Sequence, residues 1–140
     1  MENILILIVS ILSGIVTYTI SNKLNKGGVF ASASVTLISG IVFPYFFPEI
    51  GSNLMVIAAC ASYAGMVSVK NVPKLWEMVM VSVIVGSLFI IFSSAYIGVG
   101  GRLGTIAAIS CFSWIGFKKV FYSSRLEKNE KYWYKVIGIK

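Results

Sequence analysis

The chain has 140 residues, of which 57% are hydrophobic and 12% are charged, and it carries a net charge of +7 with no histidine. A soluble domain of this length has one core to fill and cannot hide several long apolar segments, so the only soluble alternative is a compact bundle of wholly buried helices. The lack of histidine removes the commonest metal ligand and the commonest general base.

Five apolar segments follow one another along the chain, each with about the 20 residues that an α-helix needs to cross a bilayer. We therefore predict an all-α integral membrane protein with five transmembrane helices in residues 1–120. A basic, aromatic tail in residues 121–140 is expected to form an interfacial helix or loop. The first segment is expected to stay in the mature protein, because Glu2 stands where a signal peptide carries basic residues. The predicted spans are Asn3–Ser21, Val29–Pro48, Gly51–Val69, Leu75–Ile97 and Gly98–Phe117.

The lysines between these segments predict the orientation of the chain. Lysine pairs follow the first, third and fifth segments, which places all three pairs on one side of a membrane if five spans alternate. Short cytoplasmic loops carry the Lys/Arg excess, so we predict an outer N-terminus and a cytoplasmic C-terminus, in a membrane of the prokaryotic inner type. Of the basic residues, only Arg102 is then predicted on the outer side. Membrane lipids account for the positive charge, and no nucleic-acid partner is needed. The lysine pairs are Lys23 with Lys26, Lys70 with Lys74, and Lys118 with Lys119.

Two similar units suggest an internal repeat. The first unit is a helix, the pair Gly27-Gly28 and a second helix; the other is the fourth helix, the pair Gly100-Gly101 and the fifth. With helix 3 between them the units would face opposite ways, as in the inverted repeats of secondary transporters. The alternative is chance recurrence, because glycine pairs are common in membrane helices and little else is shared between the units.

The two glycine pairs also mark candidate binding sites for a solute. Glycines at a helix start leave backbone N–H groups uncovered where the helix dipole is positive, so an anion can be held there. Hydroxyls in the first turns would add ligands, and Arg102 would add a positive charge. The alternative is that the glycines only permit tight turns and that the hydroxyls bond their own backbone. The candidate residues are Gly27, Gly28, Ser32, Ser34, Thr36, Gly100, Gly101, Arg102 and Thr105.

The third segment is predicted to be the central helix. Small residues recur at four-residue spacing in it, which permits close packing against several neighbours or against a second copy. Its deepest polar groups are predicted to be Ser62 and Tyr63, and the Tyr63 hydroxyl needs a partner, either a substrate or a group within the protein. Other close-contact pairs are predicted at Ser10 with Gly14 and at Gly100 with Gly104.

Glu77 lies near the start of the fourth segment and has two interpretations. Lys74 is three residues earlier, so an exposed ion pair at the helix start is the simpler one. The alternative is a gate residue or a cation ligand.

The sequence does not indicate an enzyme. Cys60 and Cys111 lie in different segments without metal-ligand spacing, and no carboxylate lies near a span centre to carry protons. No catalytic dyad or metal set can be assembled. We expect no cofactor, although sodium held by hydroxyls and carbonyls is a coupling ion that the composition allows.

One family resemblance bears on the function. The run Asn25-Lys26-Gly27-Gly28-Val29 and the later Val69-Lys70-Asn71-Val72, with the helices around them, resemble the small subunit of bacterial two-component malonate transporters over about residues 1–95. The resemblance implies sodium-linked uptake of a small carboxylate and a functional loop at Gly27 and Gly28. That subunit should end after four helices, whereas this chain continues into a fifth.

Together these features predict a small protein of the secondary-transporter type that moves a small anionic or polar solute. It is expected to act as a homodimer or with a partner subunit, because five helices leave little room for a closed path. The alternatives are a non-transporting scaffold or accessory subunit of a larger complex, and a small channel or holin-like pore.

Overall fold

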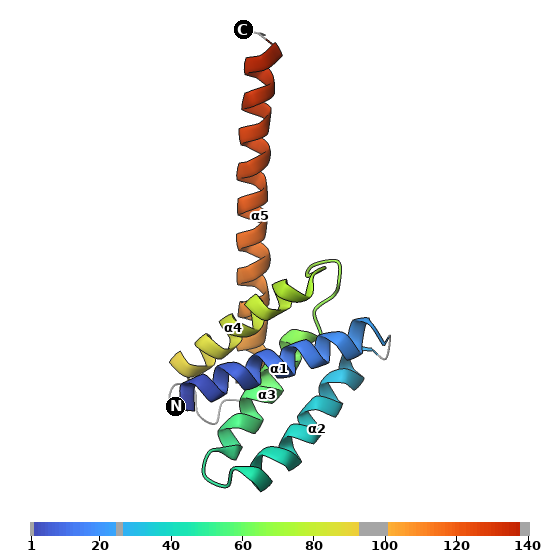
Figure 1. Ribbon diagram of the computed structural model, residues 1–140, viewed down its shortest axis with the longest axis vertical. Helices are drawn as coiled ribbons and strands as arrows, with labels where there is room; N and C mark the ends of the chain where they lie inside the picture. The colour runs from blue at the N-terminus through green and yellow to red at the C-terminus, as the bar shows by residue number, and fades with distance from the viewer. Residues whose placement is uncertain (1, 25–26, 93–100, 138–140) are drawn as a thin grey trace.

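The computed structural model describes residues 2–24, 27–92 and 101–137, and side chains within these ranges as far as Phe121. The regular structure of these ranges is helical throughout, which confirms the prediction of an all-helical chain with five helices (Figure 1). The helices are α1 (Glu2–Asn22), α2 (Gly28–Phe46), α3 (Gly51–Gly65), α4 (Leu75–Ile91) and α5 (Arg102–Ile137).

Three helices differ in length from the predicted spans. Helix α4 ends at Ile91 instead of Ile97. Helix α3 ends at Gly65 instead of Val69, because the chain tightens there: the N–H groups of Met66 and Val67 bond to carbonyls three residues earlier. Helix α5 does not end near Phe117 but continues to Ile137, so the predicted tail is helical and continuous with it. The predicted boundary between the fourth and fifth spans, Ile97 to Gly98, lies outside the described residues.

Neighbouring helices alternate in direction. The start of α1 lies beside the end of α4, and the start of α2 lies beside the end of α3, so each pair is antiparallel. Helix α5 likewise runs antiparallel to α4. The contacts that establish these directions are Leu7 with Gly86, Ser10 with Ser82 and Tyr18 with Val72; Gly28 with Met66 and Gly51 with Phe43; Glu77 with Lys118 and Phe89 with Arg102.

Helix α3 is the centre of the bundle, as predicted. It contacts each of the other four helices, whereas α2 and α5 do not contact one another within the described ranges and lie on different sides of it. Most of its residues are buried, including Ala58, Ala61 and Ser62 at complete burial. Small side chains allow this, because they let several helix backbones approach together.

The closest approach lies between α1, α3 and α4. A Cβ at Gly65 would meet Thr17 Cβ at 2.7 Å and the backbone oxygen of Gly14 at 2.9 Å, and a Cβ at Gly14 would collide with Ser82. The predicted close contact at Ser10 and Gly14 is therefore present. The one predicted at Gly104 is wrong, since no heavy atom of the described residues lies within 4 Å of a Cβ built there. Gly100, its predicted partner, lies outside the described residues.

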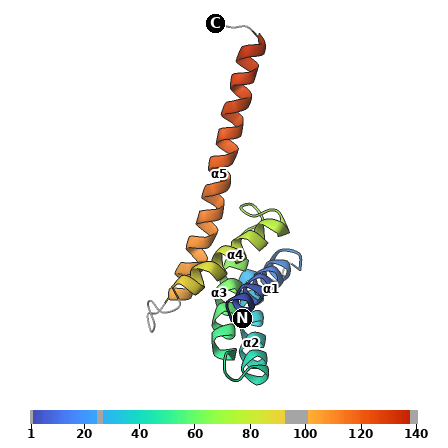
Figure 2. The same cartoon turned by 60° about the vertical axis from the view of Figure 1, so that its left-hand side comes forward.

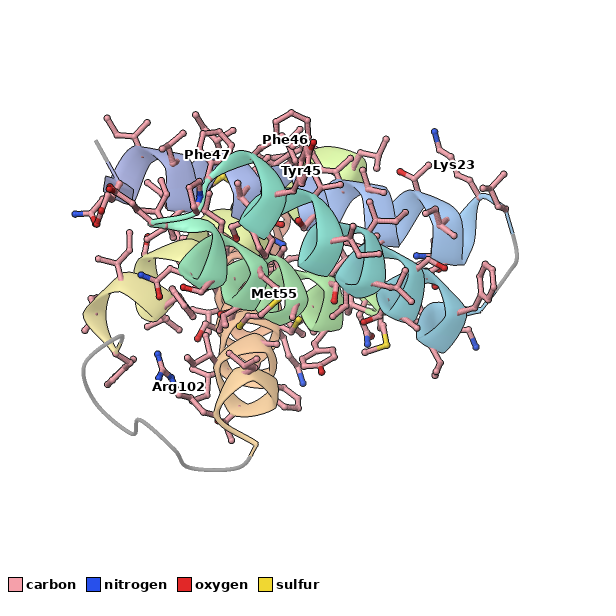
Figure 3. The ribbon with its side chains drawn as sticks, turned by 90° about the horizontal axis from the view of Figure 1, so that it is seen from below. Lys23, Tyr45, Phe46, Phe47, Met55 and Arg102 are labelled. Atoms are coloured by element: carbon pink, nitrogen blue, oxygen red, sulfur yellow. The ribbon has the colours of Figure 1, made fainter. Side chains whose placement is uncertain are left out.

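The described lysines lie at one end of the bundle, and Arg102 lies at the other. The end of α1, the connection from α3 to α4 and the position of Lys118 in α5 meet at one end, because Tyr18 bonds to Val72 and Glu77 pairs with Lys118. Arg102 lies beside Phe89 at the other end, and Figure 3 shows Lys23 and Arg102 far apart at opposite ends. The described lysines of the first end are Lys23, Lys70, Lys74, Lys118 and Lys119.

Large apolar side chains lie both in the core and on the outer surface of the bundle. Large apolar side chains are exposed on the outside, with α2 the clearest case: Val29 is 79% exposed and Ile41 66%. Eight serine and threonine side chains of the described residues are buried in the bundle. These buried hydroxyl residues are Ser10, Ser13, Thr17, Ser32, Ser39, Ser62, Ser82 and Ser110.

Within the described residues, α1 and α2 are long and apolar enough to cross a membrane, and α4 is a shorter apolar helix. The second half of α5 extends well beyond the other four helices (Figures 1 and 2).

Candidate functional site

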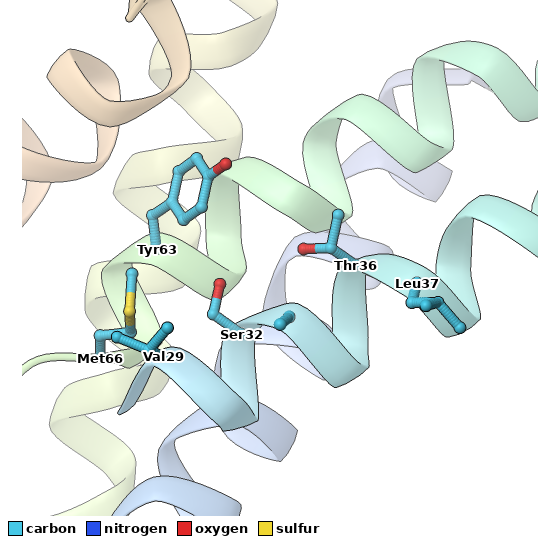
Figure 4. A pocket seen from close by; sticks show the side chains of 7 residues that line it. Val29, Ser32, Thr36, Leu37, Tyr63 and Met66 are labelled. Atoms are coloured by element: carbon cyan, nitrogen blue, oxygen red, sulfur yellow. The ribbon is translucent and has the colours of Figure 1, made fainter. Parts of the chain in front are cut away.

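A pocket of about 440 Å³ lies between the first half of α2 and the end of α3 (Figure 4). Three of its lining residues carry hydroxyl groups and the other four are apolar. Ser32 and Thr36 come from one face of α2, where residues four apart are neighbours. The lining residues are Val29, Ser32, Ala33, Thr36, Leu37, Tyr63 and Met66.

A cluster of three hydroxyls lies against this pocket. The Ser32 and Ser62 hydroxyl oxygens are 2.8 Å apart, and the Thr36 and Ser62 hydroxyl oxygens are 3.3 Å apart. Ser62 is completely buried and also donates a hydrogen bond to the backbone oxygen of Ala59 at 2.7 Å. The cluster therefore joins α2 to α3 through side chains that are 26 and 30 residues apart in sequence.

The two polar residues of α3 have different environments. Ser62 is buried as predicted, but Tyr63 is 40% exposed and lines the pocket instead of lying deep in the bundle. Consecutive residues of an α-helix point about 100° apart, so a helix that turns Ser62 toward α2 turns Tyr63 outward. The predicted buried tyrosine hydroxyl is wrong.

The first glycine pair shapes the turn beside the pocket. Gly27 has φ +86° and ψ 146°, a backbone conformation reserved almost wholly for glycine, and its carbonyl accepts the N–H of Ala31 at 3.1 Å. Gly28 lies close to Met66, since a Cβ there would be 3.2 Å from that side chain. Gly27 therefore permits the turn, and Gly28 permits the start of α2 to approach Met66 at one end of the pocket.

Two of the hydroxyl groups predicted to bind a solute are instead hydrogen-bonded to the backbone of their own helix. Ser34 donates to the backbone oxygen of Phe30 at 2.8 Å, and Thr105 donates to that of Arg102 at 2.8 Å. Each bond lies within the residue's own helix, which agrees with the alternative that such hydroxyls bond their own backbone. Neither residue lines the pocket.

The second glycine unit lies apart from the first. Gly101 has φ +83°, and its carbonyl accepts the N–H of Thr105 at 3.0 Å, so it opens α5 as Gly27 opens α2. Arg102 lies 5.5 Å from the centre of the Phe89 ring. Gly28 is near Ser21 at the end of α1, whereas Gly86, three residues before Phe89 in α4, is near Leu7 toward the start of α1, so the two units do not form one site. Gly100 lies outside the described residues.

Glu77 is paired with α5 and not with its neighbour in sequence. Its side chain is 7% exposed, and its Oε2 is 2.8 Å from Nζ of Lys118, whose side chain is 41% exposed. The predicted ion pair with Lys74 is not formed among the described residues. The indole ring of Trp76 packs edge-on against that of Trp114 beside this pair, at 5.6 Å between ring centres.

Sequence reasoning missed Lys118 as the partner of Glu77, Ser62 as the centre of the hydroxyl cluster, and the apolar side of the pocket. The apolar side of the pocket could have been predicted from residue spacing. Val29, Ala33 and Leu37 recur every four residues on α2, and Tyr63 and Met66 are three apart on α3, so each set shares one helix face.

No protein-family model matches the chain, and neither a curated protein nor a solved structure matches it. The resemblance to the small subunit of malonate transporters therefore stays a prediction.

Proposed function

We propose that the chain is a five-span membrane protein that binds a small polar solute in the pocket between α2 and α3, acting as a transporter or as a transporter subunit. The observation that carries the proposal is a pocket with three hydroxyl-bearing residues, in a bundle that exposes many large apolar side chains.

The exposed apolar surface supports a bilayer environment. Apolar residues such as Ile41 and Val29 would contact acyl chains at no cost, whereas in water they would form a large exposed patch. Buried hydroxyls that bond across helices, as Ser10 does to the backbone oxygen of Ser82 at 2.7 Å, are typical of membrane bundles.

Helix α3 is short for a membrane span, because its 15 residues rise about 22 Å. Beyond Gly65 the chain continues without regular helix: residues 68–71 are exposed, whereas Val72 is completely buried. Side chains of α1 bond to its backbone oxygens: Tyr18 bonds to Val72, and Asn22 to Val67 at 3.5 Å. Irregular backbone is tolerated at membrane depth where it is bonded in this way, and the exposed, lysine-bearing part of the connection would lie at the membrane surface.

The separation of charge supports an orientation. The lysines gathered at one end of the bundle would face the cytoplasm, with the N-terminus outside. The two glycine-opened helices would then begin at opposite faces of the membrane, as an inverted repeat of α1–α2 and α4–α5 around α3 requires.

The pocket supports binding of a small solute. Its volume of about 440 Å³ lies in the range of ligand pockets, and it combines apolar walls with a few converging polar groups. Its lining residues include no lysine or arginine, so the carboxylate uptake implied by the family resemblance is not carried into this proposal. The proposed solute class is polar. A homodimer or a partner subunit would complete the transport path.

The test is solute binding to the purified protein in mild detergent, followed by flux into proteoliposomes. A ligand at one hundred times its Kd stabilises a protein by about 2.7 kcal/mol, which a thermal unfolding assay detects. We expect Thr36→Val to weaken binding and flux, while Ser34→Ala on the same helix leaves both unchanged. Two results together would contradict this proposal: no binding or flux with any solute of a broad panel, and copurification of a second subunit in stoichiometric amount. The accessory role would then be the better interpretation.

A further inference from the structure

The hydrogen atoms of the hydroxyl cluster can be assigned from its contacts. A hydroxyl group has one hydrogen to donate and two lone pairs to accept. A backbone carbonyl can only accept, so the single hydrogen of Ser62 belongs to its 2.7 Å bond with Ala59. Ser62 must therefore be the acceptor in its two other bonds.

It follows that Ser32 and Thr36 both donate to Ser62, at 2.8 Å and 3.3 Å. Their hydrogens are then used inside the protein. The part of each hydroxyl that is left for a ligand is its lone pairs, and both residues line the pocket (Figure 4). The α2 side of the pocket thus offers hydrogen-bond acceptors.

Tyr63 supplies the complementary group. Its side chain lines the same pocket from α3 and is 40% exposed, so its O–H hydrogen is available to a ligand. None of the described lining residues is charged. An ion would lose hydration here without an opposite charge to replace it.

We propose that this pocket selects an uncharged ligand that donates hydrogen bonds, with a primary amide as the best-matched head group. This inference rests on the proposed solute-binding function. The amide N–H groups donate to Ser32 and Thr36, and its carbonyl oxygen accepts from Tyr63. A carboxylate of the same shape brings only acceptors toward the two α2 hydroxyls, and an ammonium brings an uncompensated charge.

Three probes with the same four-carbon length separate these cases: butyramide and butyrate, which share a planar head, and butylammonium. Each is titrated into the full-length protein in detergent, with thermal stabilisation and calorimetry as readouts. We expect saturable binding of butyramide and at least about tenfold weaker binding of the two ions, because a site built to hydrogen-bond one ligand group discriminates against ligands that lack it.

Variants tie the selectivity to the cluster. Thr36→Val keeps the side-chain shape and removes one acceptor, so butyramide binding should weaken, whereas the matched control Ser34→Ala should bind like the parent. Ser62→Ala removes the acceptor of both α2 hydroxyls and releases their hydrogens. We expect this variant to lose part of its preference for butyramide over butyrate, which a purely structural role of Ser62 would not produce.

The outcomes are distinct. Preferential binding of butyrate or butylammonium that Thr36→Val weakens overturns the inference and leaves the solute-binding proposal standing. Absence of binding by all three probes also overturns it. The proposed function itself is contradicted only if no solute of the wider panel binds either.

Discussion

The Glu77 carboxylate accepts a hydrogen bond from Lys118 at 2.8 Å, which joins the first turn of α4 to α5 across 41 residues of sequence. The carboxylate is almost completely buried, whereas the lysine side chain is partly exposed. Removing one partner should therefore have unequal effects, because only the glutamate would be left charged and buried.

For this pair we expect Lys118→Met to lower the free energy of unfolding by about 1–3 kcal/mol, and Glu77→Gln to lower it less. The neighbouring exposed Lys119 offers a matched control, and Lys119→Met should change stability little. Thermal unfolding in one detergent measures all three. Equal losses for Lys118→Met and Lys119→Met would show that the ion pair does not hold α4 to α5.

Gly65 and Gly104 form a second contrast. A Cβ at Gly65 would lie 2.7 Å from Thr17 Cβ and 2.9 Å from the Gly14 backbone oxygen, so Gly65→Ala must force α1 and α3 apart. We expect a loss of about 1–3 kcal/mol from this overpacking. Gly104→Ala meets no described atom within 4 Å and should be neutral or stabilise by up to about 1 kcal/mol through helix propensity. Thermal unfolding measures the stability of both variants. Wild-type stability of Gly65→Ala would contradict the close packing of α1 against α3.

Gly27 is required for its backbone conformation alone. Space around it is open, since a Cβ there would meet no described atom within 4 Å, but its φ of +86° with ψ 146° suits glycine almost exclusively. Gly27→Ala should cost about 1–3 kcal/mol, and Gly27→Asn should not restore the loss. Gly40→Ala is the control, because its Cβ would make an ordinary 3.5 Å contact with the Met55 sulfur. Chemical or thermal unfolding of the three variants measures the difference, and wild-type stability of Gly27→Ala would rule out this strained turn.

The proposed orientation predicts which residues a membrane-impermeant maleimide can reach. In a background with Cys60→Ala and Cys111→Ala, Glu49→Cys should be labelled in intact spheroplasts, and Lys70→Cys only after the membrane is opened. The physical reason is that the lysine-rich end of the bundle is retained in the cytoplasm. Equal labelling of both positions before permeabilisation would contradict a membrane-spanning bundle, and the reverse pattern would invert the orientation.

Several features of the fold could be predicted because they depend on composition along the chain. Apolar segments separated by short polar connections predict the five helices, and small residues at four-residue spacing predict the central place of α3. The grouping of Lys23, Lys70 and Lys118 at one end follows from alternation of helix direction. The lengths were less accurate: α3 ends at Gly65, where Met66 and Val67 bond three residues back and Asn22 of α1 bonds to Val67, and hydropathy does not register such bonds.

The site depended on which helix faces meet. Ser32, Ser34 and Thr36 look equivalent in sequence, but only Ser32 and Thr36 face Ser62, while Ser34 bonds to its own helix. The sequence by itself determined the number of helices, their order and the separation of charge, since these follow from hydrophobicity and connection length. Only the tertiary structure decided that Glu77 pairs with Lys118, that Tyr63 turns outward and that Gly104 packs against no described neighbour. Each of these depends on the rotation of one helix about its axis against another, and that rotation is set by packing between residues far apart in the chain.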